Sequence, residues 1–343
     1  MSRILLRNDR PVGDYHTPYI VAEMNTSHFG DLTLARAMID SAKQAGCDCV
    51  KFQSWTADTL YAKSYYKDNA IAQRFVKKLS LADEQLVTLA QHCAEVGIDF
   101  ASTPYSRHEA EFLVEQCRVP FLKIASMELN NHPYLDHLGR LGVPLVLSTG
   151  MGSMEEIRAA VEVIARTGNE RLVILHCVSV YPADPEMIRL HNILGLRSEF
   201  PQYPIGYSDH TLGTEVPVAA VALGACLIEK HFTLDSGLIG MDNQMATEPD
   251  EMARMVSACR HVHTAMGGAA RLLDEREVAQ RAKMRRSLVA ARSLPKGHVL
   301  TADDLDAKRP GTGIAPCDIA QVLGRKLVAD LDVDEAITPE HLA

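Results

Sequence analysis

The sequence of 343 residues predicts an α/β protein: a (β/α)8 TIM barrel followed by a small β-rich module. Two observations predict the barrel. Short strand-like segments alternate with helical ones eight times, and most of the strand-like segments are continuous apolar runs, typical of parallel strands buried on both faces. A doubly wound open sheet is the alternative, but the chain has no glycine-rich dinucleotide-binding fingerprint.

The eight predicted strands lie within the first 231 residues. They are expected at residues 20–24, 49–53, 99–103, 122–126, 145–149, 172–178, 205–209 and 226–231. The segments between them are amphipathic: Leu34, Met38, Ile39 and Ala42 share one helix face, as do Met252, Met255, Val256, Cys259 and Val262. Ser153 and Glu156 form a capping box that predicts the start of the fifth helix.

The alternation ends near Gly267, which divides the chain into three predicted parts. We expect the barrel over residues 1–267, a charged linker over 268–284 that is compatible with a helix, and the small module over 285–343. In that module a short strand is predicted at 287–291, a turn at 294–297 and a capped helical turn at 300–305. A module of this size is marginally stable alone, so it is expected to pack against a barrel or a partner chain.

The composition excludes several classes of protein. It is ordinary for a globular protein at 47% hydrophobic and 23% charged residues, and the formal charge of −9 argues against a nucleic-acid-binding surface. The charged N-terminus shows no signal peptide, and the apolar run 216–228 is too short to span a membrane. Eight cysteines without a CxxC pair suit a reducing cytoplasm.

The active site of such a barrel lies at the C-terminal ends of its strands, where this sequence places many polar residues. They are Glu23, Lys51, Gln53, Ser102, Lys123, Ser126, Glu128, Ser148, His176, Ser179, Tyr181, Ser208, His210 and His231. The strand lysines suit a phosphate or carboxylate, and the serines suggest a shared anion-binding role. Imidazoles at two successive strand ends predict a divalent-metal site at His210 and His231.

Each of these residues also has a purely structural interpretation. Lys51 and Lys123 are compatible with structural salt bridges, and His176, in mid-strand, is equally compatible with a hydrogen-bonded core residue. Glu23 and Glu128 are the acid–base candidates. Beside lysines they are expected to keep low pKa values, which suits a base or a hydroxyl-binding group rather than an acid.

Ordered motifs along nearly the whole chain resemble the sialic acid synthase family. They are Ala22-Glu23-Met24, Lys51-Phe52-Gln53, Lys123-Ile124-Ala125-Ser126-Met127-Glu128, Leu147-Ser148-Thr149-Gly150-Met151, Leu175-His176-Cys177, Tyr207-Ser208-Asp209-His210-Thr211, Glu229-Lys230-His231-Phe232-Thr233-Leu234-Asp235 and Lys308-Arg309-Pro310-Gly311. The resemblance implies a C-terminal antifreeze-like (SAF) domain. It also implies a transferase that condenses phosphoenolpyruvate with an N-acylated hexosamine to give a nonulosonic acid and phosphate.

The resemblance also implies roles for individual residues. Phosphoenolpyruvate would be held by Lys51, Lys123, Ser126, Ser148, Ser179 and Ser208; the sugar by Gln53, Tyr181, Asp242 and Arg309; and manganese or magnesium by His210 and His231. Glu23 and Glu128 would serve as acid–base or hydroxyl-binding groups. In the family the SAF domain caps the barrel of the other subunit, so a domain-swapped homodimer is expected, with Arg309 reaching the acyl group of the sugar.

Two segments depart from the family pattern. The usual Gly-x-Asn-His-Asn-Gly after the first glutamate reads Asn25-Thr26-Ser27-His28-Phe29-Gly30, and the usual Asp-His after the eighth strand reads Asp242-Asn243. Both segments are expected near the sugar. The sequence therefore suggests an acceptor other than plain N-acetylmannosamine, such as a diacetamido hexose leading to a legionaminic or pseudaminic acid.

Two other functions compete with this interpretation. A Schiff-base aldolase would use Lys51 or Lys123 as its nucleophile. A catalytically silent sugar-binding relative would use the SAF domain for recognition, although a binding protein has no need of Lys51, Lys123, His210, His231 and Glu128 together.

Overall fold

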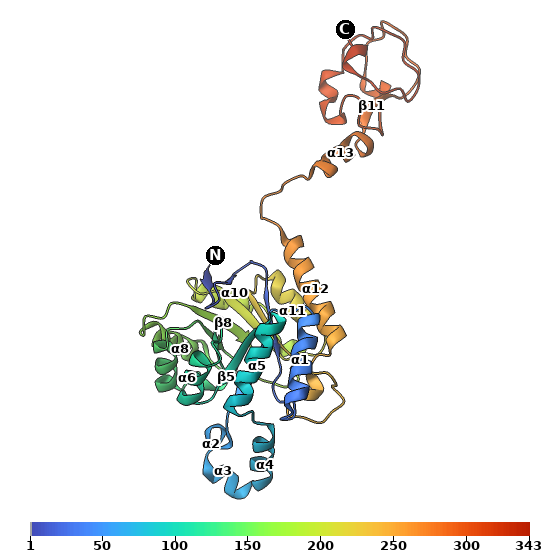
Figure 1. The fold of residues 1–343 in the computed structure, drawn as a ribbon. Helices are drawn as coiled ribbons and strands as arrows, with labels where there is room; N and C mark the ends of the chain where they lie inside the picture. The colour runs from blue at the N-terminus through green and yellow to red at the C-terminus, as the bar shows by residue number, and fades with distance from the viewer. Residues whose placement is uncertain (1) are drawn as a thin grey trace. The chain divides into compact units, whose positions relative to one another are not determined.

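The computed structural model describes residues 2–343. The chain divides into two compact units, one ending at Gly267 and the other beginning at Gly268 (Figure 1). The first unit contains a closed barrel of eight parallel strands, each paired with its neighbours in sequence. The strands are β3 (Tyr19–Glu23), β4 (Cys49–Ser54), β5 (Asp99–Pro104), β6 (Leu122–Ile124), β7 (Leu145–Ser148), β8 (Leu172–Cys177), β9 (Ile205–Asp209) and β10 (Leu227–His231). The predicted barrel is confirmed.

Helices surround the strands, and local capping fixes where several of them begin. They are α1 (Leu32–Gln44), α5 (Asp83–Val96), α6 (Arg107–Glu115), α7 (His132–Arg140), α8 (Met154–Ala165), α9 (Pro185–Ile188), α10 (Asn192–Glu199), α11 (Glu215–Ala222) and α12 (Pro249–Met266). The Ser153 hydroxyl accepts a hydrogen bond from Glu156 N, and the Glu156 carboxylate accepts one from Ser153 N. The predicted capping box therefore begins α8.

The period of two along each strand divides the side chains between two apolar cores. One face, including Val50, Ile124 and Ile228, packs against the helices. The other points into the barrel, where Val21, Val146 and other residues form a separate core. Toward the C-terminal strand ends the inward positions become polar, and these positions form the site described below.

A short hairpin closes the opposite end of the barrel. Its strands are β1 (Arg3–Leu5) and β2 (Pro11–Gly13), and Ile4, Leu6 and Val12 pack into the interior core. The amide of Arg7 donates to Pro120 O, just before β6 begins, which places the hairpin at the N-terminal strand ends. The sequence did not predict this hairpin, because three-residue strands carry too little periodicity to be recognised.

A helical excursion follows β4 and was also not predicted. It consists of α2 (Ala57–Leu60), α3 (Lys63–Asp68) and α4 (Ala70–Leu79). Figure 1 shows these helices as a group that projects on the side opposite the N-terminus. Trp55, Tyr66 and Val76 form a small core of their own within it.

The second unit begins with the linker region, where residues Glu275–Met284 form α13. Strand β11 (Ser287–Ala290) pairs antiparallel with β12 (Leu305–Lys308). The predicted capped turn is present as a 3-10 turn at Ala302–Asp304, but Leu305 already belongs to β12. The core of this unit contains eight buried residues: Leu288, Ala290, Leu294, Leu300, Val322, Leu327, Leu331 and Ile337.

Across residues 2–343, no helix combines the length and apolar character that a bilayer crossing needs.

Candidate active site

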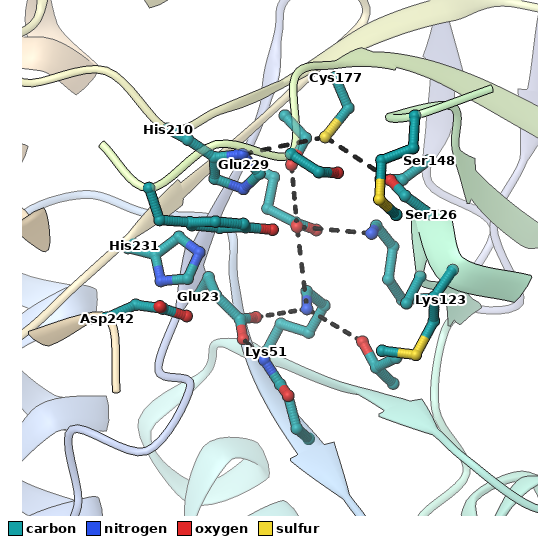
Figure 2. Close-up of a pocket in the computed structure, with 18 of the residues that line it drawn as sticks. Glu23, Lys51, Lys123, Ser126, Ser148, Cys177, His210, Glu229, His231 and Asp242 are labelled. Carbon is teal, nitrogen blue, oxygen red and sulfur yellow. Dashed lines mark hydrogen bonds and ion pairs between the residues drawn. The ribbon is translucent and has the colours of Figure 1, made fainter. Parts of the chain in front are cut away.

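A cavity of about 270 Å³ opens at the C-terminal ends of the barrel strands, and side chains from all eight strands or the loops after them line it (Figure 2). The lining residues are Glu23, Lys51, Gln53, Thr103, Tyr105, Lys123, Ala125, Ser126, Met127, Ser148, Met151, Cys177, Ser179, Tyr181, Ser208, His210, Glu229, His231 and Asp242. Pairs such as Lys51 and Gln53, or Glu229 and His231, are two residues apart, because alternate strand residues point inward.

Buried ion pairs join the two lysines at the floor of the cavity. Glu229 Oε1 lies 3.5 Å from Lys123 Nζ and 3.8 Å from Lys51 Nζ, and it accepts from Ser208 Oγ at 3.2 Å. Lys51 also contacts the Glu23 carboxylate and donates to Thr103 Oγ1 at 3.0 Å. Figure 2 shows Glu229 between the two lysines, so one carboxylate neutralises part of both charges.

Burial and pairing shift the pKa values of these four groups in different directions. Burial would raise the pKa of Glu229, but Lys123 and Lys51 lower it below the ordinary glutamate value. Burial would lower the pKa of Lys51, but Glu229 and Glu23 raise it, so Lys51 is firmly protonated. For Lys123 burial prevails over Glu229, and its pKa is lowered.

The pKa of Glu23 corrects an expectation from the sequence. A carboxylate beside a lysine was expected to keep a low pKa. Burial instead raises the pKa of Glu23, because desolvation outweighs the attraction of Lys51 and the nearby Glu229 adds to the rise. Glu23 is therefore suited to hold a proton, which is the property of an acid.

Three predicted serines gather around the backbone at Gly150. Gly150 N donates to Ser126 Oγ at 3.0 Å, and a Cβ at this position would lie 2.2 Å from Ser179 Oγ and 2.8 Å from Ser126 Oγ. Only glycine leaves the space that brings both hydroxyls this close to the backbone. Among residues 2–343 the buried Ser148 hydroxyl has no hydrogen-bond partner, so it is available to a ligand.

The two predicted metal ligands face each other across one side of the cavity. The ring centroids of His210 and His231 are 5.3 Å apart, and the Tyr181 ring lies 4.1 Å from that of His210. His210 Nδ1 lies 2.6 Å from Val178 O and donates to it. Burial would lower the pKa of His210, but Cys177 and this carbonyl raise it, so Nε2 offers a lone pair to a metal only in the neutral ring. Burial, followed by the neighbouring His210, lowers the pKa of His231 well below its ordinary value and leaves it neutral.

This donor set fits a divalent ion that takes most of its ligands from elsewhere. Among residues 2–343 no group of three or more His, Cys, Asp or Glu side chains is arranged to hold a metal. Imidazole is a common ligand of divalent transition ions, whereas manganese and magnesium prefer oxygen ligands, so water or substrate oxygens would complete the coordination shell around the two histidines.

Two of the residues predicted to bind the sugar, Gln53 and Asp242, form hydrogen bonds with neighbouring residues. Gln53 Nε2 donates to Glu23 Oε1 at 2.9 Å, and Gln53 Oε1 accepts from Tyr105 at 2.9 Å. Asp242 Oδ2 accepts from Asn25 Nδ2 at 2.6 Å. Figure 2 shows Asp242 on the side of the cavity that carries Glu23 and His231, away from Lys123.

Four predicted residues do not line this cavity. Ser102 is buried, and its Oγ lies 2.7 Å from Ser54 Oγ. Glu128 lies in a 3-10 turn after β6, where its carboxylate accepts from Asn131 at 2.7 Å. His176 points to the helical side of β8, where it donates to Ile188 O at 2.6 Å and stacks on Tyr207, as its structural interpretation implied. Arg309 is an exposed residue of the second unit, just after β12.

The sequence interpretation gave no role in the site to Glu229, Cys177 or Thr103. Glu229 could have been found from its spacing, because it lies two residues before His231 and so shares its inward face. Cys177 Sγ, 3.7 Å from Ser126 Oγ, lies two residues after the inward Leu175, but cysteine is so common in cores that this position gave no functional signal.

Comparison with known proteins decides the family. The model of the NeuB family matches residues 38–271, and that of the SAF domain matches residues 285–343. The chain belongs to the NeuB family. The resemblance found in the sequence motifs is confirmed, including the C-terminal SAF domain.

Several relatives of this NeuB-family chain match over almost its entire length. It is 39% identical to the N,N'-diacetyllegionaminic acid synthase of Legionella pneumophila, covering 97% of each chain. It is 35% identical to the human N-acetylneuraminate-9-phosphate synthase, covering 96% of this chain and 94% of that protein. The crystal structure of an N-acetylneuraminic acid synthetase from Leptospira borgpetersenii superposes with a TM-score of 0.74 at 32% identity, covering 82% of this chain and 97% of that one.

Proposed function

We propose that this protein is a nonulosonic acid synthase that condenses phosphoenolpyruvate with an N-acylated hexosamine and releases phosphate. The observation that carries the proposal is the division of one cavity. Lys51, Lys123 and the serine hydroxyls lie in the same cavity as His210 and His231, and we assign the first group to an anion and the second to a metal. Relatives whose names describe such synthases match nearly the whole chain.

The lysines and hydroxyls are assigned to phosphoenolpyruvate. Its phosphate and carboxylate carry more negative charge than Glu229 offers, so binding would favour protonation of Lys123, whose pKa burial lowers in the free protein. Ser126, Ser148, Ser179 and Ser208 would orient the anion. Positioning and fixed charges then supply most of the rate, because carbon three of phosphoenolpyruvate is only a weak nucleophile.

We assign His210 and His231 to a divalent ion, manganese or magnesium. The ion would supply a Lewis acid that polarises the aldehyde of the open-chain sugar. Carbon three of phosphoenolpyruvate forms the new bond to the aldehyde carbon, water adds at carbon two, and the tetrahedral product loses phosphate. We assign Glu23, whose pKa burial raises, as the group that would give a proton to the aldehyde oxygen.

Gln53, Tyr181 and Asp242 are assigned to the acceptor, for which we propose a diacetamido hexose. The departures from the family pattern at residues 25–30 and at Asn243 lie beside this part of the cavity, since Asn25 bonds Asp242 directly. The relative named for N,N'-diacetyllegionaminic acid supports this choice. The role of Glu128 is proposed to be indirect, because its carboxylate does not line the cavity.

We further propose a cytoplasmic homodimer in which the SAF domain of one subunit covers the cavity of the other. Met127, Met151 and Tyr181 line the cavity and remain 52%, 72% and 47% exposed. Large apolar side chains at the mouth of a polar site are typical of a surface that another part covers. Arg309 would reach the acceptor from that covering domain.

The function is tested with the full-length protein, phosphoenolpyruvate and a panel containing N-acetylmannosamine and a diacetamido hexose. We expect phosphate release and a nonulosonic acid product by mass spectrometry. Both should be abolished by a chelator and restored by manganese or magnesium. A silent sugar-binding protein would show no turnover at any metal level. A clear preference for N-acetylmannosamine would overturn the proposed acceptor but leave the reaction intact.

One observation keeps the Schiff-base aldolase as a second candidate. Burial lowers the pKa of Lys123, and an amine nucleophile must lose its proton before it attacks a carbonyl. Lys51 does not share this property, since Glu229 and Glu23 raise its pKa. Borohydride should trap a covalent adduct at Lys123 in an aldolase, whereas the synthase should give none.

A further inference from the structure

Asn25, just after β3, has a strained backbone next to the cavity. Its φ of +41° lies in the left-handed region that side-chain-bearing residues rarely occupy, and Phe29 in the same loop has a φ of +49°. The side chain of Asn25 is only 4% exposed. Such strain persists only where the surrounding contacts fix it, and it is concentrated at functional sites.

The contacts that fix Asn25 involve two residues of the cavity wall. Its side-chain Nδ2 donates to Asp242 Oδ2 at 2.6 Å, although the two residues are 217 positions apart in the sequence. Its backbone N donates to Glu23 Oε1 at 3.2 Å. One residue therefore holds the carboxylates of Glu23 and Asp242 in a fixed relation across two separate loops.

These bonds continue a chain that crosses the acceptor side of the cavity. Tyr105 donates to Gln53 Oε1, and the Gln53 amide donates to Glu23 Oε1, both at 2.9 Å. The order of donors fixes the Gln53 amide orientation and supplies Glu23 Oε1 with two donors. With Oδ2 held by Asn25, the carboxylate of Asp242 has one preferred orientation and its Oδ1 remains for a ligand hydroxyl.

The loop that carries Asp242 is also held by other hydrogen bonds, among them one from Ser236 Oγ to Glu248 Oε1 at 2.6 Å. Asn243 Nδ2 donates to Asp235 O and Leu238 O, each at 2.8 Å. At Gly240 a Cβ would lie 2.8 Å from the Asn243 Cβ and 3.3 Å from the Phe29 ring, so the two loops pack closely there. These contacts place the loop, whereas the Asn25 side chain sets the direction of the Asp242 carboxylate.

We propose that Asn25 is a positioning residue that aims the Asp242 carboxylate at the acceptor sugar and thereby helps to determine which acceptor is used. The inference deepens the proposed function and rests on it. Asn25 acts on the acceptor only through Asp242 and Glu23, because it does not itself line the cavity.

The test compares Asn25→Gly with Asn25→Asp in the full-length protein. Glycine removes the side-chain donor and tolerates the left-handed backbone, so folding is preserved. Aspartate keeps the shape but places a carboxylate against Asp242. We expect Asn25→Gly to raise the KM for the acceptor about tenfold, with the KM for phosphoenolpyruvate unchanged, and Asn25→Asp to raise it further.

The matched control is Arg118→Gly. Arg118 is an exposed residue with a φ of +50° outside the cavity, so it undergoes the same kind of substitution without touching the acceptor site. Its kinetic constants should match those of the unaltered protein. A lower melting temperature with equal changes in both KM values would show that Asn25 is merely structural, and an unchanged acceptor KM in Asn25→Gly would refute its positioning role.

The unaltered protein separates failure of this inference from failure of the proposed function. If it releases no phosphate from phosphoenolpyruvate with N-acetylmannosamine or with a diacetamido hexose, the proposed function fails. If it turns over one of them and Asn25→Gly keeps the same acceptor KM and the same ratio of the two acceptors, only the inference fails.

Discussion

At the scale of single residues, the site is organised by a carboxylate that the family resemblance did not bring out. Glu229 lies within 3.8 Å of both lysine nitrogens, and its Oε2 has no hydrogen-bond partner in the described part of the chain, residues 2–343. Two buried ammonium groups would repel each other strongly without it. A phosphate entering between the lysines would therefore compete with Glu229 for the same two cations, which makes the site selective for ligands of high negative charge.

The buried His28 predicts how stability depends on pH. Burial lowers its pKa from 6.5 to about 4, and only a backbone hydrogen bond at Asn25 opposes this shift. Because the unfolded chain binds a proton below pH 6.5 and the folded chain does not, stability is full above that pH. It falls as the pH drops toward 4, by up to about 3 kcal/mol.

Replacing His28 with glutamine should remove most of this dependence. An amide stays neutral and its oxygen can accept from Gly30 N, as His28 Nδ1 does at 3.1 Å. The measurement is urea unfolding of the two proteins between pH 7 and pH 4. The control is His108→Gln, since His108 is 77% exposed at its side chain and should leave the curve unchanged. Equal pH slopes for His28→Gln and the unaltered protein would contradict the expectation.

At the scale of elements, periodicity decided what the sequence could reveal. Buried parallel strands such as 172–178 give apolar runs that stand out, and the barrel followed from eight of them. Short elements carry too few residues to show a period. The hairpin of β1 and β2, strand β12 and helices α2 to α4 were therefore not predicted. The polar residues at the strand ends indicated where the site lies, because alternate residues of each strand point into the barrel.

Pairings between loops could not be predicted from sequence. The bond from Asn25 to Asp242 joins residues 217 positions apart, and no local pattern encodes it. The raised pKa of Glu23 was missed because the depth of burial is a property of the assembled barrel. A sequence shows which charges are near one another along a strand, but not how much water remains around them.

The turn after β7 yields a prediction at this scale. Gly150→Ala would place a Cβ 2.2 Å from Ser179 Oγ and 2.8 Å from Ser126 Oγ, so at least one hydroxyl must leave the anion site. We expect the KM for phosphoenolpyruvate to rise about tenfold or more, with the acceptor KM changed little. Steady-state kinetics with each substrate varied in turn checks this.

The control for Gly150→Ala is Gly195→Ala in α10. A Cβ at Gly195 meets nothing within 4 Å, and alanine favours a helix interior, so both KM values should be unchanged. Unchanged phosphoenolpyruvate binding in Gly150→Ala would show that Ser126 and Ser179 do not contact that substrate.

At the scale of the whole molecule, the two units differ in the size of their hydrophobic cores. The barrel unit has a large core shared by its strands and helices, whereas the core of the second unit contains only eight buried residues. Its Asp304 is nevertheless well satisfied, accepting from Arg292 at 2.6 Å, His298 at 2.8 Å and Thr301 at 2.7 Å. Met127, Met151 and Tyr181 stay exposed at the mouth of the barrel cavity, and this exposure is the basis for the proposed cover.

A mixed dimer tests whether that cover comes from the other subunit. Arg309→Ala removes the proposed acceptor contact of the SAF domain, and Lys123→Ala removes the phosphoenolpyruvate site of the barrel. Each variant alone should be poorly active at low acceptor concentration. If the SAF domain acts across subunits, a dimer of one Arg309→Ala and one Lys123→Ala chain has one site with both changes and one with neither. Purified through two different tags, it should recover about half of the unaltered activity, because one of its two sites is intact.

The same mixed dimer distinguishes the alternatives clearly. If Arg309 acts within its own chain, each site carries one change and the activity stays as low as that of the separate variants. If the chain is a monomer, no mixed species survives the two-tag purification. A further dimer pairs the unaltered chain with the double variant Lys123→Ala, Arg309→Ala and reverses the expectation. If Arg309 acts across subunits, each site carries one change and little activity remains. If Arg309 acts within its own chain, one site is intact. The two dimers contain the same substitutions in the same number, so differences in folding or stability cannot account for opposite activities. Opposite activities would therefore report which subunit's barrel Arg309 acts on.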